Sequence, residues 1–244
     1  MDFIVVIPAR YHASRLPAKL LANIHGKPLI QYTYENAQSS NATQVVIATD
    51  DRRIEKAAQG FGATTCMTSV AHCSGTARIA EVLEQLSVAD DTVVVNVQGD
   101  EPMLDGQVID QVAHNLVTSQ MHMATLSEPI TNKQQYLDPN CVKVVFNALG
   151  KALYFSRAPI PAFRETDAFD TTVCFKHIGI YAYSAAFVRQ YANMGHSTYE
   201  QAENLEQLRI LHQGYSIHVA AACASTGFGV DTAEDLAQVR EALQ

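Results

Sequence analysis

The chain has 244 residues, of which 48% are hydrophobic and 17% are charged, so it can bury a sizeable core and shows no segment of disordered composition. Its formal net charge of −8 argues against a general surface for nucleic acid or anionic membranes. No apolar run approaches the length of a membrane span or a signal peptide, so we expect a cytoplasmic protein without nucleic-acid or membrane partners.

The first part of the chain alternates short apolar strands with helices. Strands are expected at 3–7, 44–49 and 92–97, and the last has four valines in six residues, which indicates burial on both faces. Helices are expected at 28–40 and 52–61. This alternation predicts an α/β fold with a mostly parallel, doubly wound sheet.

After about residue 120 the strands follow one another with short connections. Strands are expected at 121–129, 142–146, 152–156, 174–183 and 215–222, helices at 198–213 and 232–243, and a polar loop at 157–172. We therefore expect one domain over 1–244, in which 1–120 and 215–244 carry the doubly wound sheet and 121–214 forms a smaller inserted part.

The loop after the first strand concentrates positive charge. Residues 3–34 include Arg10, Arg15, Lys19 and Lys27 and no carboxylate. The loop lies just beyond the carboxyl end of the first strand, where open α/β sheets bind their ligands. Because neighbouring cations repel each other unless they share an anion, we expect a triphosphate here, although the loop matches neither the Walker A motif nor the dinucleotide fingerprint.

Two aspartates are candidate ligands for Mg²⁺, which prefers oxygen donors and often takes one or two carboxylates together with phosphate oxygens. Asp100 follows the valine-rich strand directly, and Gly99 before it permits a close backbone approach. Asp231 ends the stretch Gly227-Phe228-Gly229-Val230 and also suits a helix N-cap. Both roles are compatible if Thr232 caps the helix.

A set of short motifs spans nearly the whole chain. In order, they are Ile7-Pro8-Ala9-Arg10-Tyr11, Ser14-Arg15-Leu16-Pro17, Gly26-Lys27-Pro28, Ala48-Thr49-Asp50, Ser74-Gly75-Thr76, Asn96-Val97-Gln98-Gly99-Asp100-Glu101-Pro102, Tyr154-Phe155-Ser156-Arg157, His177-Ile178-Gly179-Ile180-Tyr181, Leu205-Glu206-Gln207-Leu208-Arg209 and Gly229-Val230-Asp231-Thr232. This ordered set resembles the 3-deoxy-manno-octulosonate (Kdo) cytidylyltransferases.

The resemblance implies a GT-A-like nucleotidyltransferase fold, a homodimer and a requirement for Mg²⁺. It implies transfer of CMP from CTP to Kdo, which gives CMP-Kdo and pyrophosphate for lipopolysaccharide biosynthesis. The inserted part, 121–214, would serve sugar binding and dimerisation.

The resemblance also assigns roles to single residues. The CTP side would comprise Ala9, Arg10, Ser14, Arg15, Lys19, Ser74 and Arg78, with Arg10, Lys19 and Asp100 as the catalytic groups. Asp100 and Asp231 would hold the metal. The sugar acid would be bound by Gln98, Arg157, His177, Tyr181, Glu206 and Gln207.

The residues themselves support these sugar contacts unevenly. Arg157 suits a carboxylate, because a guanidinium can bind one bidentately, but a surface arginine fits the pattern equally well. His177 lies in an apolar strand, where a core histidine is the default. Glu206 and Gln207 are adjacent in the expected helix 198–213, so at most one should face a pocket fully, unless the pocket caps the side of the helix.

Two positions depart from the family pattern and leave alternatives open. Ala18 stands where the family has glycine, which suggests a differently shaped loop, and Ala77 stands where it has an acid. The acceptor could therefore be the 8-amino analogue of Kdo, or the chain could be a non-catalytic nucleotide-binding relative. A GT-A glycosyltransferase is a further alternative, which the strongly cationic loop disfavours.

Overall fold

The structure, a computed structural model, describes residues 1–12, 15–72, 74–165 and 169–244. Within them, a mixed sheet of nine strands has the order β11-β7-β10-β6-β1-β4-β5, with β8 paired to β10 and β9 paired to β8. Its strands are β1 (Phe3–Ala9), β4 (Gln44–Thr49), β5 (Thr64–Met67), β6 (Val93–Asn96), β7 (Met123–Pro129), β8 (Lys143–Phe146), β9 (Ala152–Ser156), β10 (Phe175–Ser184) and β11 (Ile217–Ala221). A separate two-stranded ribbon joins β2 (Asn23–Ile24) to β3 (Lys27–Pro28).

The amino-terminal part of the sheet is parallel, as the alternation of strands and helices predicts. β1 pairs in parallel with β4 and β6, and β4 pairs in parallel with β5. The apolar side chains of β1 are buried on both faces of the sheet: Val5 and Ile7 on one face, Ile4 and Val6 on the other. A continuous apolar run in this strand is therefore needed for packing.

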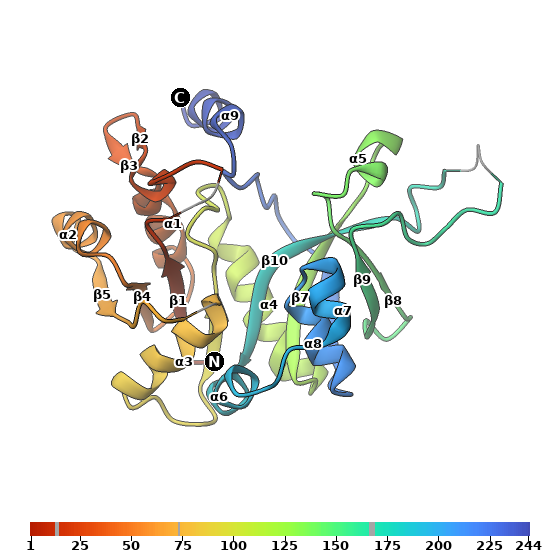
Figure 1. The fold of residues 1–244 in the computed structure, drawn as a ribbon, viewed down its shortest axis with the longest axis horizontal. Helices are drawn as coiled ribbons and strands as arrows, with labels where there is room; N and C mark the ends of the chain where they lie inside the picture. The colour runs from red at the N-terminus through yellow and green to blue at the C-terminus, as the bar shows by residue number, and fades with distance from the viewer. Residues whose placement is uncertain (13–14, 73, 166–168) are drawn as a thin grey trace.

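The helices cover both faces of the sheet (Figure 1). One face packs against α1 (Leu29–Gln38), α2 (Arg52–Gly60), α4 (Gly106–Ser119) and α9 (Ala233–Ala242), and the other against α3 (Gly75–Gln85), α6 (Ala185–Ala192) and α8 (Gln207–His212). Among the described residues, no helix is long and apolar enough to cross a membrane. The layered, largely parallel sheet confirms the predicted α/β fold class.

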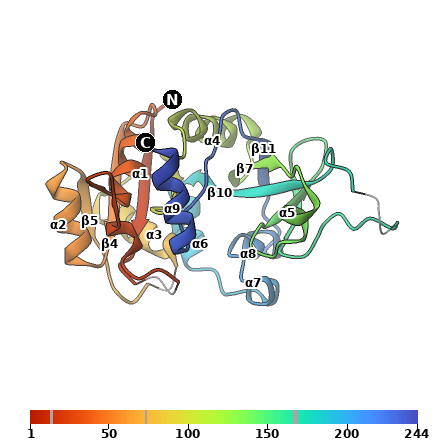
Figure 2. The same cartoon turned by 90° about the horizontal axis from the view of Figure 1, so that it is seen from above.

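The sheet continues through the part of the chain that we expected to be a separate insertion. β10 is antiparallel to both β6 and β7, and β11 returns to pair in parallel with β7. The division into 1–120 with 215–244 and 121–214 therefore stays a prediction. What does leave the body is the segment with α5 (Lys133–Leu137), β8, β9 and the following loop, which projects to one side (Figures 1 and 2).

One expected helix, 198–213, is two helices in the structure. α7 (Thr198–Glu203) ends at Asn204, which takes the left-handed conformation with φ of 51°, and α8 begins at Gln207. Asparagine adopts this conformation more readily than most residues, so it can end a helix without glycine. The expectation of one continuous helix was wrong. The chain changes direction between Asn204 and Gln207, where α8 begins.

Candidate functional site

A cavity of about 370 Å³ opens at the carboxyl ends of β1 and β6. We call it the cationic cavity. It is lined by Pro8, Arg10, His12, Arg15, Lys19, Leu20, Ser74, Gly75, Gln98, Gly99, Asp100, Glu206 and Asp231. The cationic loop, the metal candidates and part of the predicted sugar set thus meet at the edge where parallel sheets bind ligands.

The Lys19 ammonium contacts two carboxylates and a backbone carbonyl in this cavity. Its Nζ lies 2.5 Å from Asp100 Oδ2 and 2.9 Å from Asp231 Oδ1, and it also donates to the Val230 carbonyl at 2.9 Å. Burial alone would lower the pKa of Lys19, but the two carboxylates raise it above its ordinary value. The lysine therefore stays protonated beside the acid pair.

The loop that carries Lys19 is held by its own backbone. The Ala18 N–H donates to the Tyr11 carbonyl, and Ala18 has φ of 56°, the left-handed region that favours glycine. A short 3-10 turn, Lys19–Leu21, follows. Ala18 thus adopts a conformation that glycine would take more cheaply, and the expectation of a differently shaped loop stays a prediction.

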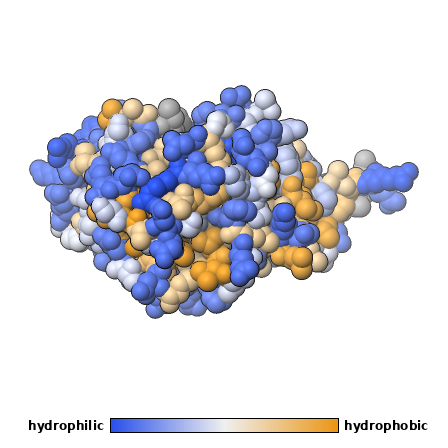
Figure 3. All heavy atoms as spheres, turned by 90° about the horizontal axis from the view of Figure 1, so that it is seen from below, coloured by the Kyte–Doolittle hydropathy of each residue, from blue (hydrophilic) through white to orange (hydrophobic). Residues whose placement is uncertain are grey.

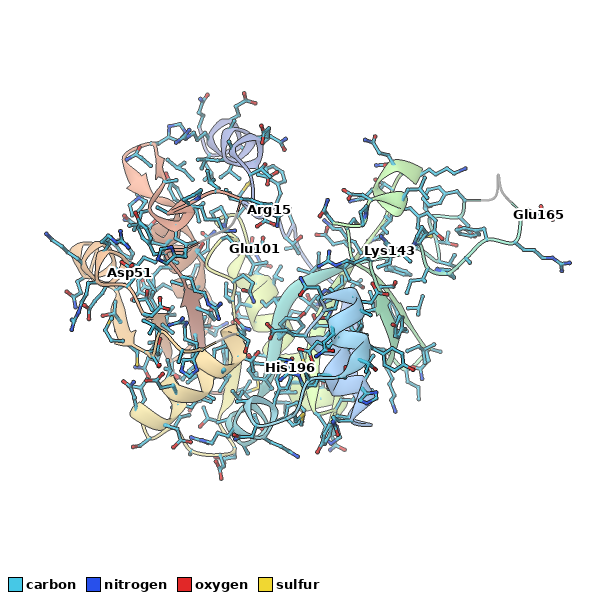
Figure 4. All side chains as sticks on the ribbon, in the orientation of Figure 1. Arg15, Asp51, Glu101, Lys143, Glu165 and His196 are labelled. Atoms are coloured by element: carbon cyan, nitrogen blue, oxygen red, sulfur yellow. The ribbon has the colours of Figure 1, made fainter. Side chains whose placement is uncertain are left out.

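Arg10 and Arg15 also line the cationic cavity, whereas Lys27 pairs with Glu35 outside it. Arg15 pairs with Asp231 at 2.7 Å between an Nη and Oδ2, and Arg10 donates to the His72 carbonyl. Figure 4 labels Arg15 on the loop beside the body of the sheet. Ser14, which the resemblance assigns to the triphosphate, lies outside the described residues.

The start of α3 forms the opposite wall of the cationic cavity. Ser74 caps the helix by accepting a hydrogen bond from the Ala77 N–H at 3.1 Å. In the caps of α7 and α9 the third residue of the helix is an acid that closes a capping box, whereas Ala77 has no such group. The missing acid is thus at a position suited to helix capping.

A second, smaller cavity of about 190 Å³ joins the first, and we call it the polar cavity. Gly75, Gln98 and Glu206 line both. The full lining of the polar cavity is Gly75, Thr76, Asn96, Gln98, Met123, Tyr181, Tyr183, Tyr191, Asn204, Leu205, Glu206 and Gln207. This lining offers amides and phenols, and its one charged side chain is the Glu206 carboxylate.

Glu206 and Gln207 both line the polar cavity, which meets α8 at its start, and this is the exception that the expectation allowed. Glu206 is the N-cap of α8 and Gln207 its first residue, so neither is constrained as in mid-helix. Burial raises the pKa of the Glu206 carboxyl, and its Oε2 lies 3.4 Å from the Thr76 hydroxyl. The break at Asn204 is what lets adjacent residues share one pocket.

Asp100 and Asp231 suit a divalent cation. Both carboxylates converge on the Lys19 ammonium, so their oxygens already lie around one positive charge. In the part of the chain that the structure describes, no group of three or more acids, histidines or cysteines could hold a metal. Two carboxylates beside a cationic loop have the oxygen donors with which Mg²⁺ is bound together with substrate phosphates.

Comparison with known proteins decides the family. A family model described as cytidylyltransferase matches residues 4–217. A protein of Ruthia magnifica subsp. Calyptogena magnifica named 3-deoxy-manno-octulosonate cytidylyltransferase is 65% identical over 243 residues, which cover 100% of both chains. This chain belongs to the Kdo cytidylyltransferase family.

Further relatives agree. A Kdo cytidylyltransferase 1 of Actinobacillus pleuropneumoniae serotype 5b is 51% identical, with 100% of both chains covered. A solved CMP:2-keto-3-deoxy-manno-octonic acid synthetase in complex with CTP is 40% identical with a TM-score of 0.90, covering 100% of this chain and 98% of that one. A 4-diphosphocytidyl-2C-methyl-D-erythritol synthase, 11% identical with a TM-score of 0.65, shares the fold; the match covers 100% of this chain and 99% of that one.

Not every residue that the family resemblance assigns lines the two cavities. Arg78 is fully buried in α3, where its guanidinium binds Asp50 at 2.7 Å and also the Thr68 hydroxyl. Ala9 is buried at the end of β1, next to the lining residues Pro8 and Arg10. Their contacts with a nucleotide remain predictions.

Arg157 and His177 lie beside the polar cavity but outside its lining. Arg157 donates to three main-chain carbonyls, those of Glu203, Pro139 and Asn204, at 2.7 to 3.3 Å. His177 Nε2 lies 3.0 Å from the Thr125 hydroxyl, and burial lowers the pKa of His177 to about 3. Its ring packs against Tyr181, which does line the cavity.

Several lining residues escaped the sequence reasoning. Asn96 carried a signal, because it is the single amide in a strand of valines and a buried amide there requires a partner. Tyr183 lies two residues beyond Tyr181 on the same face of β10. Asn204 could not be found, because the break that it makes in the helix was not expected.

Proposed function

We propose that this chain transfers CMP from CTP to Kdo and releases pyrophosphate. The observation that carries the proposal is the junction of two unlike cavities at Gln98 and Glu206: one lined by three cations that share two aspartates, and one by amides and phenols. Triphosphate oxygens suit the first lining, and sugar hydroxyls suit the second. Membership of the Kdo cytidylyltransferase family supports the same reaction, since a relative with that name is 65% identical to this chain.

The geometry suggests how the reaction proceeds. The C2 hydroxyl of Kdo forms a bond to the α-phosphorus of CTP while the bond between that phosphorus and the pyrophosphate oxygen breaks. Arg10, Arg15 and Lys19 line the side of the junction where charge develops on the leaving pyrophosphate. Glu206 lines both cavities, so its carboxylate is suited to accept a hydrogen bond from the attacking hydroxyl.

We also propose that Asp100 and Asp231 hold Mg²⁺ when CTP is bound. The ion would lower the negative charge at the α-phosphate and polarise the attacking hydroxyl. Support comes from the convergence of the two carboxylates and from their oxygen chemistry.

Product analysis tests the proposed function. Purified protein is incubated with Mg²⁺, Kdo and each of CTP, UTP, ATP and GTP, and sugar nucleotide and pyrophosphate are quantified. We expect CMP-Kdo and pyrophosphate in equal amounts with CTP. A folded protein that releases no pyrophosphate with CTP and Kdo at any Mg²⁺ concentration contradicts the proposal.

A homodimer is the assembly we propose. Large apolar side chains are exposed on the projecting segment, including Leu149 at 81% and Leu153 at 60%. The surface view shows hydrophobic atoms gathered where this segment leaves the body (Figure 3). Leu137 and Val173 in the same region are also exposed, so a second copy could cover this surface. Light scattering after size exclusion tests the mass.

We propose that the reaction takes place in the cytoplasm and supplies lipopolysaccharide biosynthesis. The four cysteines that the structure describes are free thiols, as expected in a reducing compartment. Fractionation of cells followed by the product assay tests the location.

A further inference from the structure

The chain just before α3 makes a direct contact with a cation of the cationic cavity. Arg10, which lines that cavity, donates from an Nη atom to the His72 carbonyl at 3.1 Å. A guanidinium has several N–H donors, so this bond leaves the others for phosphate oxygens. His72 itself lines neither the cationic nor the polar cavity. The orientation of Arg10 therefore depends on a backbone carbonyl that is held outside both cavities.

A single carboxylate oxygen holds both ends of the segment 69–72. Glu81 Oε2 accepts a hydrogen bond from the Ser69 N–H at 2.8 Å and lies 2.5 Å from His72 Nε2. Because an ionised carboxylate only accepts, the histidine nitrogen is the donor. The other oxygen, Oε1, accepts from Gln85 Nε2 at 2.9 Å. Burial alone would raise the pKa of the Glu81 carboxyl, but these hydrogen bonds lower it, so the carboxyl stays ionised.

The place of Glu81 on α3 explains how it reaches this segment. Ala77, Glu81 and Gln85 follow one another at intervals of four residues, so they lie on one side of the helix. Ala77 cannot close a capping box, whereas Glu81, one turn later, supplies a carboxylate to the chain that precedes the helix. The side chains of Glu81 and His72 are 28% and 23% exposed, so their hydrogen bond is partly shielded from water. Hydrogen bonds to an ionised group are among the strong ones.

We propose that Glu81 and His72 are positioning residues that hold Arg10 in place to bind the triphosphate. Glu81 holds the His72 ring, and the His72 carbonyl holds one Nη atom of Arg10. A cation that is held before the substrate arrives loses less conformational entropy on binding, and it is already in place when charge develops on the leaving pyrophosphate. The proposal rests on the proposed transfer of CMP and deepens it, since it names residues outside both cavities that act on the CTP side.

A double-mutant cycle between Glu81 and Arg10 tests the proposal. Wild type, Glu81→Ala, Arg10→Gln and the double variant are compared by kcat/KM for CTP at saturating Kdo and by the Kd for CTP with Mg²⁺. Glu81→Ala should lower kcat/KM for CTP by about tenfold or more and leave the KM for Kdo unchanged, because a small displacement of a positioned group is costly. In the Arg10→Gln background, Glu81→Ala should cause little further loss, because the two residues act as one unit.

Two further variants separate this path from general damage to the fold. His72→Ala keeps the carbonyl that Arg10 contacts but loses the ring that Glu81 holds, so it should reproduce the loss caused by Glu81→Ala. Glu84→Ala is the matched control. Glu84 lies on the same helix and accepts a hydrogen bond from Arg189 on the exposed surface, so its loss should leave kcat/KM and the Kd for CTP unchanged.

Losses that add fully in the Arg10→Gln background contradict the proposal, since Glu81 would then act only on the fold. Unchanged kinetics of Glu81→Ala contradict it too, as does a loss that merely follows the unfolded fraction in a thermal melt. If Glu81→Ala does not fold, His72→Ala decides through the same cycle with Arg10. A wild type that binds CTP but makes no CMP-Kdo overturns the proposed function alone; the positioning is then judged from the Kd for CTP, and equal affinity of wild type and Glu81→Ala contradicts it. A wild type that binds no CTP overturns both.

Discussion

Replacing Asp100 with asparagine separates a metal ligand from a structural carboxylate. The Asp100 carboxylate bonds Lys19 Nζ at 2.5 Å, and the same ammonium reaches Asp231 at 2.9 Å. In the sequence alone, Asp100 and Asp231 are two carboxylates that should repel each other. Replacing Asp100 with the neutral asparagine should then not lower the stability of the fold. The structure reverses that expectation, because the half-buried Lys19 lies between the two carboxylates and stabilises both.

We expect Asp100→Asn to cost about 1–2 kcal/mol of unfolding free energy without metal, since a charge-assisted hydrogen bond is weakened while Lys19 keeps Asp231 and a carbonyl. For a chain of this size, that lowers the melting temperature by about 2–8 °C. Turnover should fall by about a hundredfold or more, equivalent to about 2.7 kcal/mol of barrier, because a directly coordinating carboxylate is lost.

The assay is kcat at saturating CTP and Kdo over a Mg²⁺ titration, beside a thermal melt in chelator. Asp110→Asn is the control for loss of one charge, since Asp110 accepts bonds from Asn41 on the exposed surface and lies outside both cavities. Near-normal kcat for Asp100→Asn refutes the assignment. Loss of activity only in proportion to unfolded protein refutes it as well.

Three further changes probe the loop, a buried histidine and the arginine beside the polar cavity. Ala18→Gly should raise stability by up to about 1 kcal/mol in chemical denaturation, because relief of the left-handed alanine exceeds the added chain entropy; a less stable variant contradicts this. Burial lowers the pKa of His177 to about 3, so below about pH 6.5 the unfolded chain binds a proton on this histidine that the folded chain does not. The free energy of unfolding should therefore fall as the pH drops from 6.5 toward 3, by about 2 kcal/mol at pH 5. Urea melts at pH 5 and 7 should show that this loss is smaller in His177→Gln, and equal pH dependence in both proteins contradicts it. Arg157→Gln should lower the melting temperature and raise the KM for Kdo together, because three carbonyls lose their donor; a higher KM with an unchanged melt would instead indicate direct contact with the substrate.

The parallel part of the fold was accessible from sequence because local and global signals agree there. The strand 44–49 was predicted with its observed bounds, since its apolar run ends at the polar pair Asp50 and Asp51. The helix 198–213 was predicted as continuous because no glycine or proline interrupts it. Asn204 ends it through a backbone conformation that composition does not reveal.

The site divides in the same way. Lys19, Asp100 and Asp231 are far apart in sequence and meet because each follows the carboxyl end of a strand or loop at one edge of the sheet. Their roles toward phosphate and metal stay predictions. Partner choice did not follow from the sequence. The Arg157 guanidinium could bind a carboxylate, yet it donates to the backbone carbonyls of Glu203 and Asn204, which are 46 and 47 positions away in the sequence. Only tertiary structure decides which acceptor a guanidinium meets.

The cationic cavity contains carboxylates that pair with its cations. Arg15 and Lys19 are each held by a carboxylate of the same cavity, so the protein's own positive charge is largely compensated before a substrate binds. A triphosphate brings more negative charge than this arrangement can offset by itself. If a divalent cation joins Asp100 and Asp231, the Arg15 and Lys19 side chains become available to phosphate oxygens. Binding of CTP and binding of the cation are then coupled, and each must raise the affinity for the other by the same factor.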